Sequence, residues 1–388
     1  SATADVETAF LKLIGMNSIT VAANSQIVRE TTGIEVVLVL DNTGSMSQSG
    51  KIDALRVAAQ DMVDILFEDE QNPEKIFMGL VPFVATVNIG KDLENFVNAP
   101  SPPHDYPGSI DDEWKGCVEA RTSGHDLTDD FSGGTGVDGK WDPYYWEAEA
   151  IFDSQGFFSF CPNTWWFPTF FSNSYPTGRS GNNFSSSHPA GLGGFSITGI
   201  DTPDTSPFEE QGLSLILGQF GLCPFCTTGD TFGPNKACPD PIMPLTNSRT
   251  TVESAIAQMM PWPANGTMAN LGAVWGWRVL SPTSPFTEGQ PYDDPSFNKV
   301  LIILTDGDNL LSSGDLIFQN NCRDVNSKYN SHYSAYGYLS EGRLGTTNSN
   351  TAQNQLDQKL RDVFDLAKRK SLITNIIVHG SHGNQTNC

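Results

Sequence analysis

Three apolar runs restrict the fold of this chain more than any other feature of its sequence. They read IEVVLVL at residues 34–40, KVLIIL at residues 299–304 and SLITNIIV at residues 371–378. Continuous apolar runs of this length, rich in β-branched residues, are typical of strands that are covered on both faces, as in parallel sheets. The sequence therefore predicts buried strands that need helices on both sides of their sheet.

Segments with helical periodicity separate these strands. Within residues 50–69, apolar side chains recur at the spacing of one helix face, at Leu55, Ala58, Ala59, Met62, Val63 and Leu66. Further helices are expected at residues 249–260, 267–280 and 354–370. Residues 75–90 indicate two short strands broken near Pro82. Strands that alternate with helices favour an α/β fold with a doubly wound, mostly parallel sheet, in which ligands bind beyond the carboxyl ends of the strands.

Both periodicities disappear between residues 92 and 247. This segment is rich in Gly, Pro and aromatic residues and holds five of the seven cysteines. Such a long irregular loop is unusual in a compact domain, and its aromatic residues argue against disorder. We interpret residues 92–247 as a disulfide-stapled lobe inserted into an α/β domain of residues 1–91 and 248–388. An aromatic group is interpreted as the core of this lobe, with a carbohydrate- or partner-binding face as the alternative: Trp165, Trp166, Phe167, Phe170 and Phe171.

The cysteines favour disulfide bonds over zinc. The one CxxC pair, Cys223 and Cys226, lacks a second pair at a zinc-binding spacing, and most cysteines lie in sequence typical of loops. We expect Cys117 and Cys238 to join the two ends of the lobe. The other proposed pairs are Cys322 with Cys388, and Cys161 with Cys223 or Cys226. Disulfides imply an oxidising compartment outside the cytosol.

The net charge restricts the partners. With 22 Lys and Arg against 45 Asp and Glu, the formal net charge is −23. Such a surface repels phosphate backbones and anionic bilayers, which excludes nucleic acid as a general partner. It suits divalent cations and solubility outside the cell. No apolar run approaches the roughly 18 residues of a membrane span, and no signal peptide is recognisable at the start, so we expect a mature or trimmed product.

Oxygen-bearing side chains follow two of the predicted strands and precede a predicted helix. Asp41, Thr43 and Ser45 alternate in the stretch DNTGS, Thr267 lies in NGTMAN, and Asp306 lies in LTDGDN. Each motif alone is common in turns and helix caps, but together they supply hard oxygens at one end of the sheet. We therefore predict one site for Mg²⁺ or Ca²⁺, with the hydroxyls as direct ligands and the aspartates binding directly or through water.

The same motifs resemble a known family. VVLVLDNTGSMS, GTMANLGAVWGW and LIILTDGDN look like the three loops of a von Willebrand factor A domain with its metal-ion-dependent adhesion site. WKGCVEAR, PIMPLT, WGWRVLSPTSPFTEGQPYDD and YSAYGYLSEGRLG resemble the TadG-like proteins of bacterial tight-adherence (Tad) pilus systems. The resemblance implies an A-type domain with a long insertion, on the bacterial cell surface or in the periplasm.

This chain departs from the family pattern in three places. Met268 occupies a position that is usually Asn in the family. The family usually carries an N-terminal membrane helix, so membrane attachment is expected only through such a helix. The family also continues into a further helix after the last strand.

The resemblance implies a module for divalent-cation-dependent adhesion, in which a partner's acidic residue completes the coordination of the metal. We expect it to support Tad pilus assembly or surface attachment through pilus or surface components. The alternative is a structural subunit of a surface fibre that self-assembles and in which the metal only stabilises the loops. We do not expect an enzyme, because no general base or activated nucleophile accompanies the three motifs.

Overall fold

The structure is a computed structural model that describes residues 2–7, 18–23, 32–98, 114–131, 139–145, 191–192, 195–196, 237–262, 266–311, 325–326 and 331–378. The chain divides into two compact units, Ser1–Thr32 and Gly33–Cys388. The first unit contains two antiparallel strands, β1 (Ala2–Glu7) and β2 (Ser18–Ala23). The second unit contains the sheet and helices that the sequence predicts.

A seven-stranded sheet forms the centre of the second unit, with strand order β14-β10-β3-β4-β5-β6 and β9 paired to β4. Its parallel strands are β3 (Gly33–Asp41), β4 (Ile76–Phe83), β10 (Phe297–Thr305) and β14 (Ile373–Val378). Its antiparallel strands are β5 (Val87–Asn88), β6 (Cys117–Val118) and β9 (Met243–Thr246). The sheet is therefore mostly parallel, as predicted, with an antiparallel edge.

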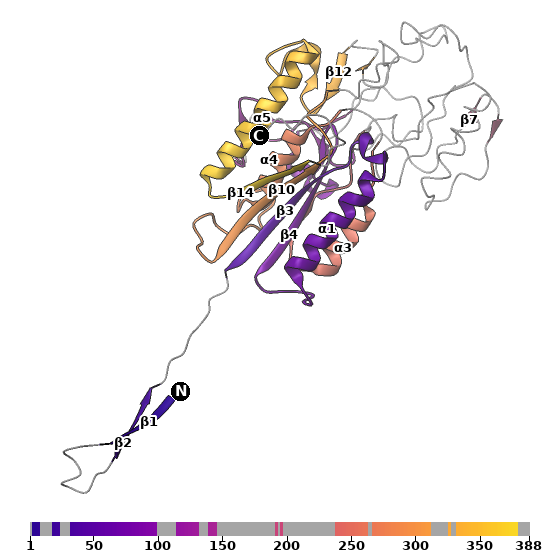
Figure 1. The fold of residues 1–388 in the computed structure, drawn as a ribbon. Coiled ribbons are helices and arrows are strands. Elements are labelled where there is room, and N and C mark those ends of the chain that lie inside the picture. The colour runs from indigo at the N-terminus through magenta and orange to yellow at the C-terminus, as the bar shows by residue number, and fades with distance from the viewer. Residues whose placement is uncertain are drawn as a thin grey trace, which may run out of the picture. The chain divides into compact units, whose positions relative to one another are not determined.

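Helices cover both faces of this sheet (Figure 1). One face packs against α1 (Lys51–Phe67) and α3 (Arg249–Gln258), and the other against α4 (Ala269–Leu280), which in turn packs on α5 (Ser349–Arg369). Successive residues of β3 divide between the two cores, because side chains alternate across a strand. The sequence-based prediction of an α/β fold with a mostly parallel sheet flanked by helices is confirmed at this level.

Helix α4 lies close against the sheet and is buried along its whole length. A Cβ atom added to Gly276 would collide with the side chains of Leu301 and Val39. A larger residue at this position would push the helix away from β3 and β10. Because α4 begins near the carboxyl ends of these strands, this close packing fixes the position of the preceding segment, which carries Thr267.

Short elements complete the described structure. Further strands are β7 (Gly191–Leu192), β8 (Phe195–Ser196), β11 (Val325–Asn326), β12 (Ser331–Ser334) and β13 (Gly337–Tyr338). Short 3₁₀ helices span Gly44–Ser47, Lys91–Phe96, His125–Leu127 and Leu339–Glu341. Among the helices that the structure describes, none combines the length and the apolar character needed to cross a bilayer.

The two short strands expected in residues 75–90 are β4 and β5, and the break between them falls just after Pro82, at residues 84–86. Strand β4 continues through Pro82 to Phe83, and Pro82 lies in register with Leu40 of β3. Proline lacks the N–H that an interior strand position needs. Pro82 is tolerated because it falls between the residues of β4 that pair with β9 and the residue, Phe83, that pairs with β5.

The boundaries of the predicted lobe do not coincide with the edge of the sheet. Strands β6 and β9 both lie between residues 92 and 247, yet both belong to the seven-stranded sheet. Sequence periodicity misses them because they have only 2 and 4 residues, respectively. The aromatic group at residues 165–171 lies outside the described residues.

Cys117 and Cys238 form a disulfide, which is the pair expected to join the two ends of the lobe. Both cysteines are fully buried and pack in a small core with Tyr144, Tyr333 and Tyr338. The bond fastens β6, at the antiparallel edge, to the segment that leads into β9. The remaining proposed pairs involve Cys161, Cys223, Cys226, Cys322 and Cys388, which lie outside the described residues.

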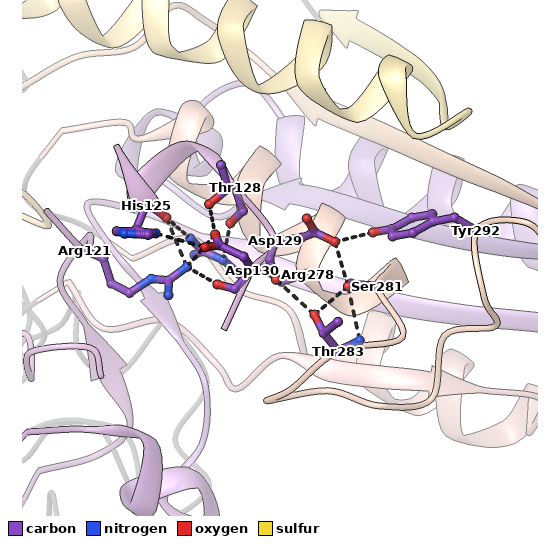
Figure 2. Close-up of polar contacts among 9 residues, drawn as sticks. All are labelled: Arg121, His125, Thr128, Asp129, Asp130, Arg278, Ser281, Thr283 and Tyr292. Carbon is purple, nitrogen blue, oxygen red and sulfur yellow. Dashed lines mark hydrogen bonds and ion pairs between the residues drawn. The ribbon is translucent and has the colours of Figure 1, made fainter. Parts of the chain in front are cut away.

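Residues 121–131 are held against the end of α4 by a buried polar network (Figure 2). Arg278, in the last turn of α4, donates to the carbonyl oxygens of Thr128 at 3.1 Å and His125 at 2.9 Å. Ser281 donates to a carboxylate oxygen of Asp129 at 2.8 Å, and Tyr292 donates to the same oxygen. This part of the predicted lobe therefore packs on the α/β domain.

A buried carboxyl near this network makes stability depend on pH. Burial raises the pKa of Glu119 from 4.5 to about 7, although Arg343 and the Tyr333 hydroxyl favour its charged form; Asp142 also raises it. The folded state thus retains a proton that the unfolded state releases, and stability is lost as pH rises from about 4.5 to about 7. This shift corresponds to about 3 kcal/mol.

Glu119→Gln is expected to remove most of this pH-dependent loss, because glutamine does not titrate. Urea unfolding of both proteins at pH 5 and pH 8 measures it. The matched control is Glu94→Gln, at an exposed position, which should keep the pH dependence of the parent. An equal loss between the two pH values in the parent and in Glu119→Gln would contradict the role of Glu119.

Candidate metal centre

The first loop of the predicted site is DNTGS, residues 41–45, and its residues hydrogen-bond to the carboxylate of Asp41 at the end of β3. The backbone N–H of Thr43 donates to Asp41 Oδ1 at 2.9 Å, and the Thr43 hydroxyl donates to the same oxygen at 2.6 Å. Thr43 has extended backbone angles and precedes the 3₁₀ turn Gly44–Ser47, which leads into α1. This local pattern, an aspartate that caps the loop after it, is common in turns, so these two bonds alone do not indicate a ligand site.

The third loop of the predicted site is LTDGDN, residues 304–309. The parallel pairing of β3 and β10 brings it beside the first loop. Leu304 lies in register with Leu40, so the next residues, Thr305 and Asp41, are neighbours across the strands. The Thr305 hydroxyl donates to Asp41 Oδ2 at 2.6 Å. The backbone N–H of Asp306 lies 3.4 Å from the same oxygen.

A chain of oxygen atoms links four of the five predicted ligands. The Thr43 hydroxyl contacts Asp41 Oδ1 at 2.6 Å and the Ser45 hydroxyl at 3.0 Å. The Ser45 hydroxyl in turn donates to Asp306 Oδ1 at 2.9 Å. Two carboxylates from the ends of neighbouring parallel strands are thus joined through two hydroxyls.

Thr267 is placed next to the third loop through its backbone. Its N–H donates to the carbonyl oxygen of Leu310 at 2.6 Å, and its carbonyl accepts from the N–H of Leu310 at 2.8 Å. Gly266 has a φ of 58°, and a Cβ there would strike the Leu310 carbonyl, so this close approach requires glycine. Among the described residues, the Thr267 hydroxyl makes no hydrogen bond with the other four predicted ligands.

The helix after this loop begins later than the sequence indicates. Helix α4 starts at Ala269, and Met268 occupies the capping position without a side-chain bond. The Met268 side chain is fully buried, and its N–H donates to the carbonyl of Val84 at 2.9 Å. The buried Met268 side chain therefore holds the loop in place through apolar packing.

Asn309 joins the third loop to two helices. Its Oδ1 accepts from the N–H of Asn270 at 3.2 Å, and its Nδ2 donates to Asp357 of α5 at 2.9 Å. The Asn309 residue is 1 % exposed. Asp308 beside it is exposed.

The two carboxylates differ in their electrostatic surroundings. Burial raises the pKa of Asp41, and the negative charge of Asp306 raises it further, whereas hydrogen bonds from Thr305 and Thr43 lower it. Within the described part of the chain, no Lys, Arg or His side chain pairs with Asp41. Asp306 instead accepts from the Lys51 ammonium at 2.8 Å. One fully buried carboxylate thus has only neutral donors around it.

Thr305 and Lys51 belong to the site but are not among the residues predicted from sequence. Thr305 directly precedes Asp306, and only the strand register shows that it faces Asp41. Lys51 is the first residue of α1, a position where lysine is commonly a solvated charge. No sequence signal separates these two roles from ordinary strand and helix positions.

No group of three or more His, Cys, Asp or Glu side chains that could hold a metal ion occurs within the described ranges. A cation at this site would therefore depend on hydroxyl oxygens in addition to two carboxylates. No family model matches this chain, and a search of curated proteins finds no similar sequence.

Proposed function

We propose that this protein is an extracellular binding module of the von Willebrand factor A type, resembling TadG-like proteins. In this proposal Asp41, Thr43, Ser45, Thr267 and Asp306 hold one Mg²⁺ or Ca²⁺. The ion would supply a coordination position for an acidic group of a protein ligand at the bacterial surface. The observation that carries the proposal is the pair of carboxylates joined by hydroxyls at the ends of β3 and β10.

The donor set fits a hard divalent cation. Carboxylate and hydroxyl oxygens are the ligands that Mg²⁺ and Ca²⁺ prefer. The oxygen–oxygen separations along the chain are 2.6, 3.0 and 2.9 Å. Adjacent ligands of an octahedral Mg²⁺ lie about 3 Å apart, given metal–oxygen distances of about 2.1 Å. These oxygens therefore need little movement to serve as neighbouring ligands.

The charge of the site supports the same proposal. Asp41 is fully buried and has no cationic partner among the described residues, which is costly for a carboxylate. A divalent cation would balance Asp41 and Asp306 together. With three neutral hydroxyls completing the set, the ion would keep its attraction for an incoming carboxylate. The proposal assigns the protein no enzymatic activity.

The location of the site agrees with the architecture. In sheets whose helices cover both faces, ligands bind beyond the carboxyl ends of the parallel strands. Asp41 and Thr305 are the last residues of β3 and β10, and Asp306 follows directly. The candidate site therefore lies at the edge of the sheet where this architecture binds ligands.

The proposal is tested with the full chain after removal of cations by EDTA. Calorimetric titration with Mg²⁺, Ca²⁺ and Mn²⁺ should show one site per chain. With Mn²⁺ bound, adding acetate as a carboxylate probe should displace metal-bound water and lower the proton relaxation rate. If none of the three cations binds, the metal centre is refuted; if a cation binds and acetate has no effect, the open coordination position is refuted.

Thr267 provides a prediction for the second loop. Thr267→Val keeps the shape of the side chain and the backbone contacts with Leu310 but removes the hydroxyl. We expect cation binding to weaken about tenfold or more. The melting temperature in EDTA should change by no more than about 2 °C, because the Thr267 hydroxyl makes no hydrogen bond with the part of the chain that the structure describes.

The control is Thr267→Ser, which retains the hydroxyl and should bind cations like the parent. Titration calorimetry and melting curves of the three proteins decide the question. Equal cation affinity in Thr267→Val and Thr267→Ser would exclude the Thr267 hydroxyl as a ligand. The role of Thr267 would then be its pair of backbone hydrogen bonds with Leu310.

A second candidate function is a self-assembling subunit of a surface fibre. Edge strand β14 carries exposed apolar residues, with Ile373 52 %, Ile376 38 %, Ile377 52 % and Val378 58 % exposed. An open, apolar edge strand is a template for pairing with another chain, here a second copy. Sedimentation at increasing protein concentration, with and without EDTA, should show assembly that persists without the metal. A monomer at every concentration would exclude this alternative.

A further inference from the structure

Lys51 contacts the candidate metal centre from the start of α1. Its ammonium lies 2.8 Å from Asp306 Oδ2, while Ser45 donates to the other oxygen of the same carboxylate at 2.9 Å. The Asp306 side chain is 5 % exposed and the Lys51 side chain 17 % exposed. The ammonium therefore reaches a nearly buried carboxylate while part of the lysine stem remains at the surface.

This contact joins the segment after the first loop of the site to the third loop. Lys51 follows the first loop in sequence, whereas Asp306 belongs to the third loop, 255 residues away. Within the described residues, Lys51 is the cation that pairs with either carboxylate of the site. Without it, Asp41 and Asp306 would repel each other at the ends of neighbouring strands, with only hydroxyl and amide donors between them.

We propose that Lys51 is a tethered counter-ion, which holds the first and third loops together in the cation-free protein and is displaced from Asp306 when a divalent cation binds. This inference rests on the proposed metal centre and concerns what sets its affinity. A divalent cation and an ammonium on the same carboxylate repel each other, and this repulsion is strong where water is largely excluded. The flexible four-carbon stem of Lys51 allows the ammonium to move outward into solvent.

Because the Lys51 ammonium and the cation compete for Asp306, removing the charge of Lys51 should tighten cation binding. Lys51→Met keeps most of the apolar stem and a good helix-forming residue but removes the charge. We expect the Kd for Mg²⁺ or Ca²⁺ to fall about tenfold or more in this variant. Lys51→Arg retains the charge and should keep a Kd within about threefold of the parent.

A remote lysine controls for the change in net charge. Lys368 is exposed in the last turn of α5, which leads into the start of β14 and so lies at the opposite end of the sheet from the site. Lys368→Met makes the same change in net charge and should bind cations like the parent. If Lys51→Met binds no more tightly than Lys368→Met, the counter-ion role is overturned.

Stability without cations gives a second readout. In EDTA, Lys51→Met should melt below the parent, because the two carboxylates lose their internal counter-ion. On addition of saturating Mg²⁺ its melting temperature should rise by more than that of the parent. A Lys51→Met protein that is as stable as the parent in EDTA would contradict the holding role.

Amine labelling tests the displacement in the unaltered protein. Acetic anhydride is applied briefly with EDTA or with saturating Mg²⁺, and the acetylation of each lysine is measured by peptide mass spectrometry. Lys51 should react faster with Mg²⁺, whereas Lys368 should react equally in both. Cation binding with unchanged Lys51 labelling overturns this inference alone. Absence of cation binding in both the parent and Lys51→Met overturns the proposed metal centre as well.

Discussion

Asp41→Asn is expected to abolish divalent-cation binding, with a loss of affinity of about 100-fold or more. Asp41 is the fully buried carboxylate at the end of β3, and both of its oxygens accept hydrogen bonds from residues of the site. Asparagine preserves the size of the side chain but removes the charge that would balance the cation. Binding of acetate to the Mn²⁺-loaded protein should disappear with the metal.

The same substitution is expected to have the opposite effect on stability with and without cation. Burial raises the pKa of Asp41, so ionisation of this carboxyl disfavours the folded protein in EDTA as the pH rises. Asp41→Asn should therefore melt at or slightly above the temperature of the parent. With Mg²⁺ at about 100 times the Kd, the parent should gain about 2.7 kcal/mol, whereas the variant gains nothing.

Asp308→Asn is the matched control for this experiment. It removes one negative charge from the same loop, but Asp308 is exposed and makes no contact with the site that the structure describes. It should retain the cation affinity and the Mg²⁺-dependent rise in melting temperature. Calorimetric melts of the three proteins, with EDTA and with millimolar Mg²⁺ or Ca²⁺, provide the measurement. If Asp41→Asn gains as much stability from cations as the parent, DNTGS forms only a turn and does not supply metal ligands.

Removing the Cys117–Cys238 disulfide is expected to cost about 4–5 kcal/mol in the free energy of unfolding. The bond joins residues 121 positions apart, and a disulfide that closes a long loop restricts the unfolded chain strongly. Both cysteines are fully buried against tyrosines, so their replacement also loses packing. The double variant Cys117→Ala, Cys238→Ala should unfold at a much lower urea concentration than the parent.

The disulfide prediction can be separated from the loss of the cysteine side chains. Unfolding of the parent with a thiol reductant keeps both side chains but breaks the bond, and its midpoint should fall towards that of the double variant. Adding the reductant to the double variant is the control: any further fall in its unfolding midpoint comes from reduction of disulfides between the other cysteines. Peptide mapping under non-reducing conditions should recover Cys117 linked to Cys238; recovery of Cys117 as a free thiol would refute the bond.

The disulfide and the metal centre should contribute independently. The disulfide fastens the antiparallel edge of the sheet, at β6, whereas the site lies where β3 and β10 end. Effects of distant substitutions generally add. The double cysteine variant should therefore keep its cation affinity at temperatures where it remains folded.

Much of the fold follows from the sequence by itself. The apolar runs at residues 34–40, 299–304 and 371–378 become β3, β10 and β14. The first two runs are largely buried, as continuous apolar runs predict. The expectation that the third run is buried is wrong, because β14 lies at the edge of the sheet and most of its side chains are exposed. The helical segments between them become α1, α3, α4 and α5 within a few residues. Asp41, Thr43, Ser45 and Asp306 could be grouped because the carboxyl ends of parallel strands share one edge.

The finer packing was decided by the tertiary structure. On α1 the predicted apolar face included Ala58, yet Ala58 is exposed, and Ile52 and Phe67 are buried instead. A helical period allows several neighbouring faces, and contact with the sheet and α3 selects one of them. Strands β6 and β9 are too short to show a period and exist because β5 and β4 offer them hydrogen-bonding partners.

The partners of the site residues also depend on pairing across the sheet. Thr305 donates to Asp41 across 264 residues of sequence, and Lys51 reaches Asp306 across 255. Asn309 connects α4 to α5 only because both helices pack on the same face. The local sequence determined which residues carry oxygen and charge at the ends of the strands. Only strand register and helix packing decided which of them touch. Those contacts join segments that are far apart in the sequence, and the local periodicity of a helix or strand does not indicate which distant segments will meet.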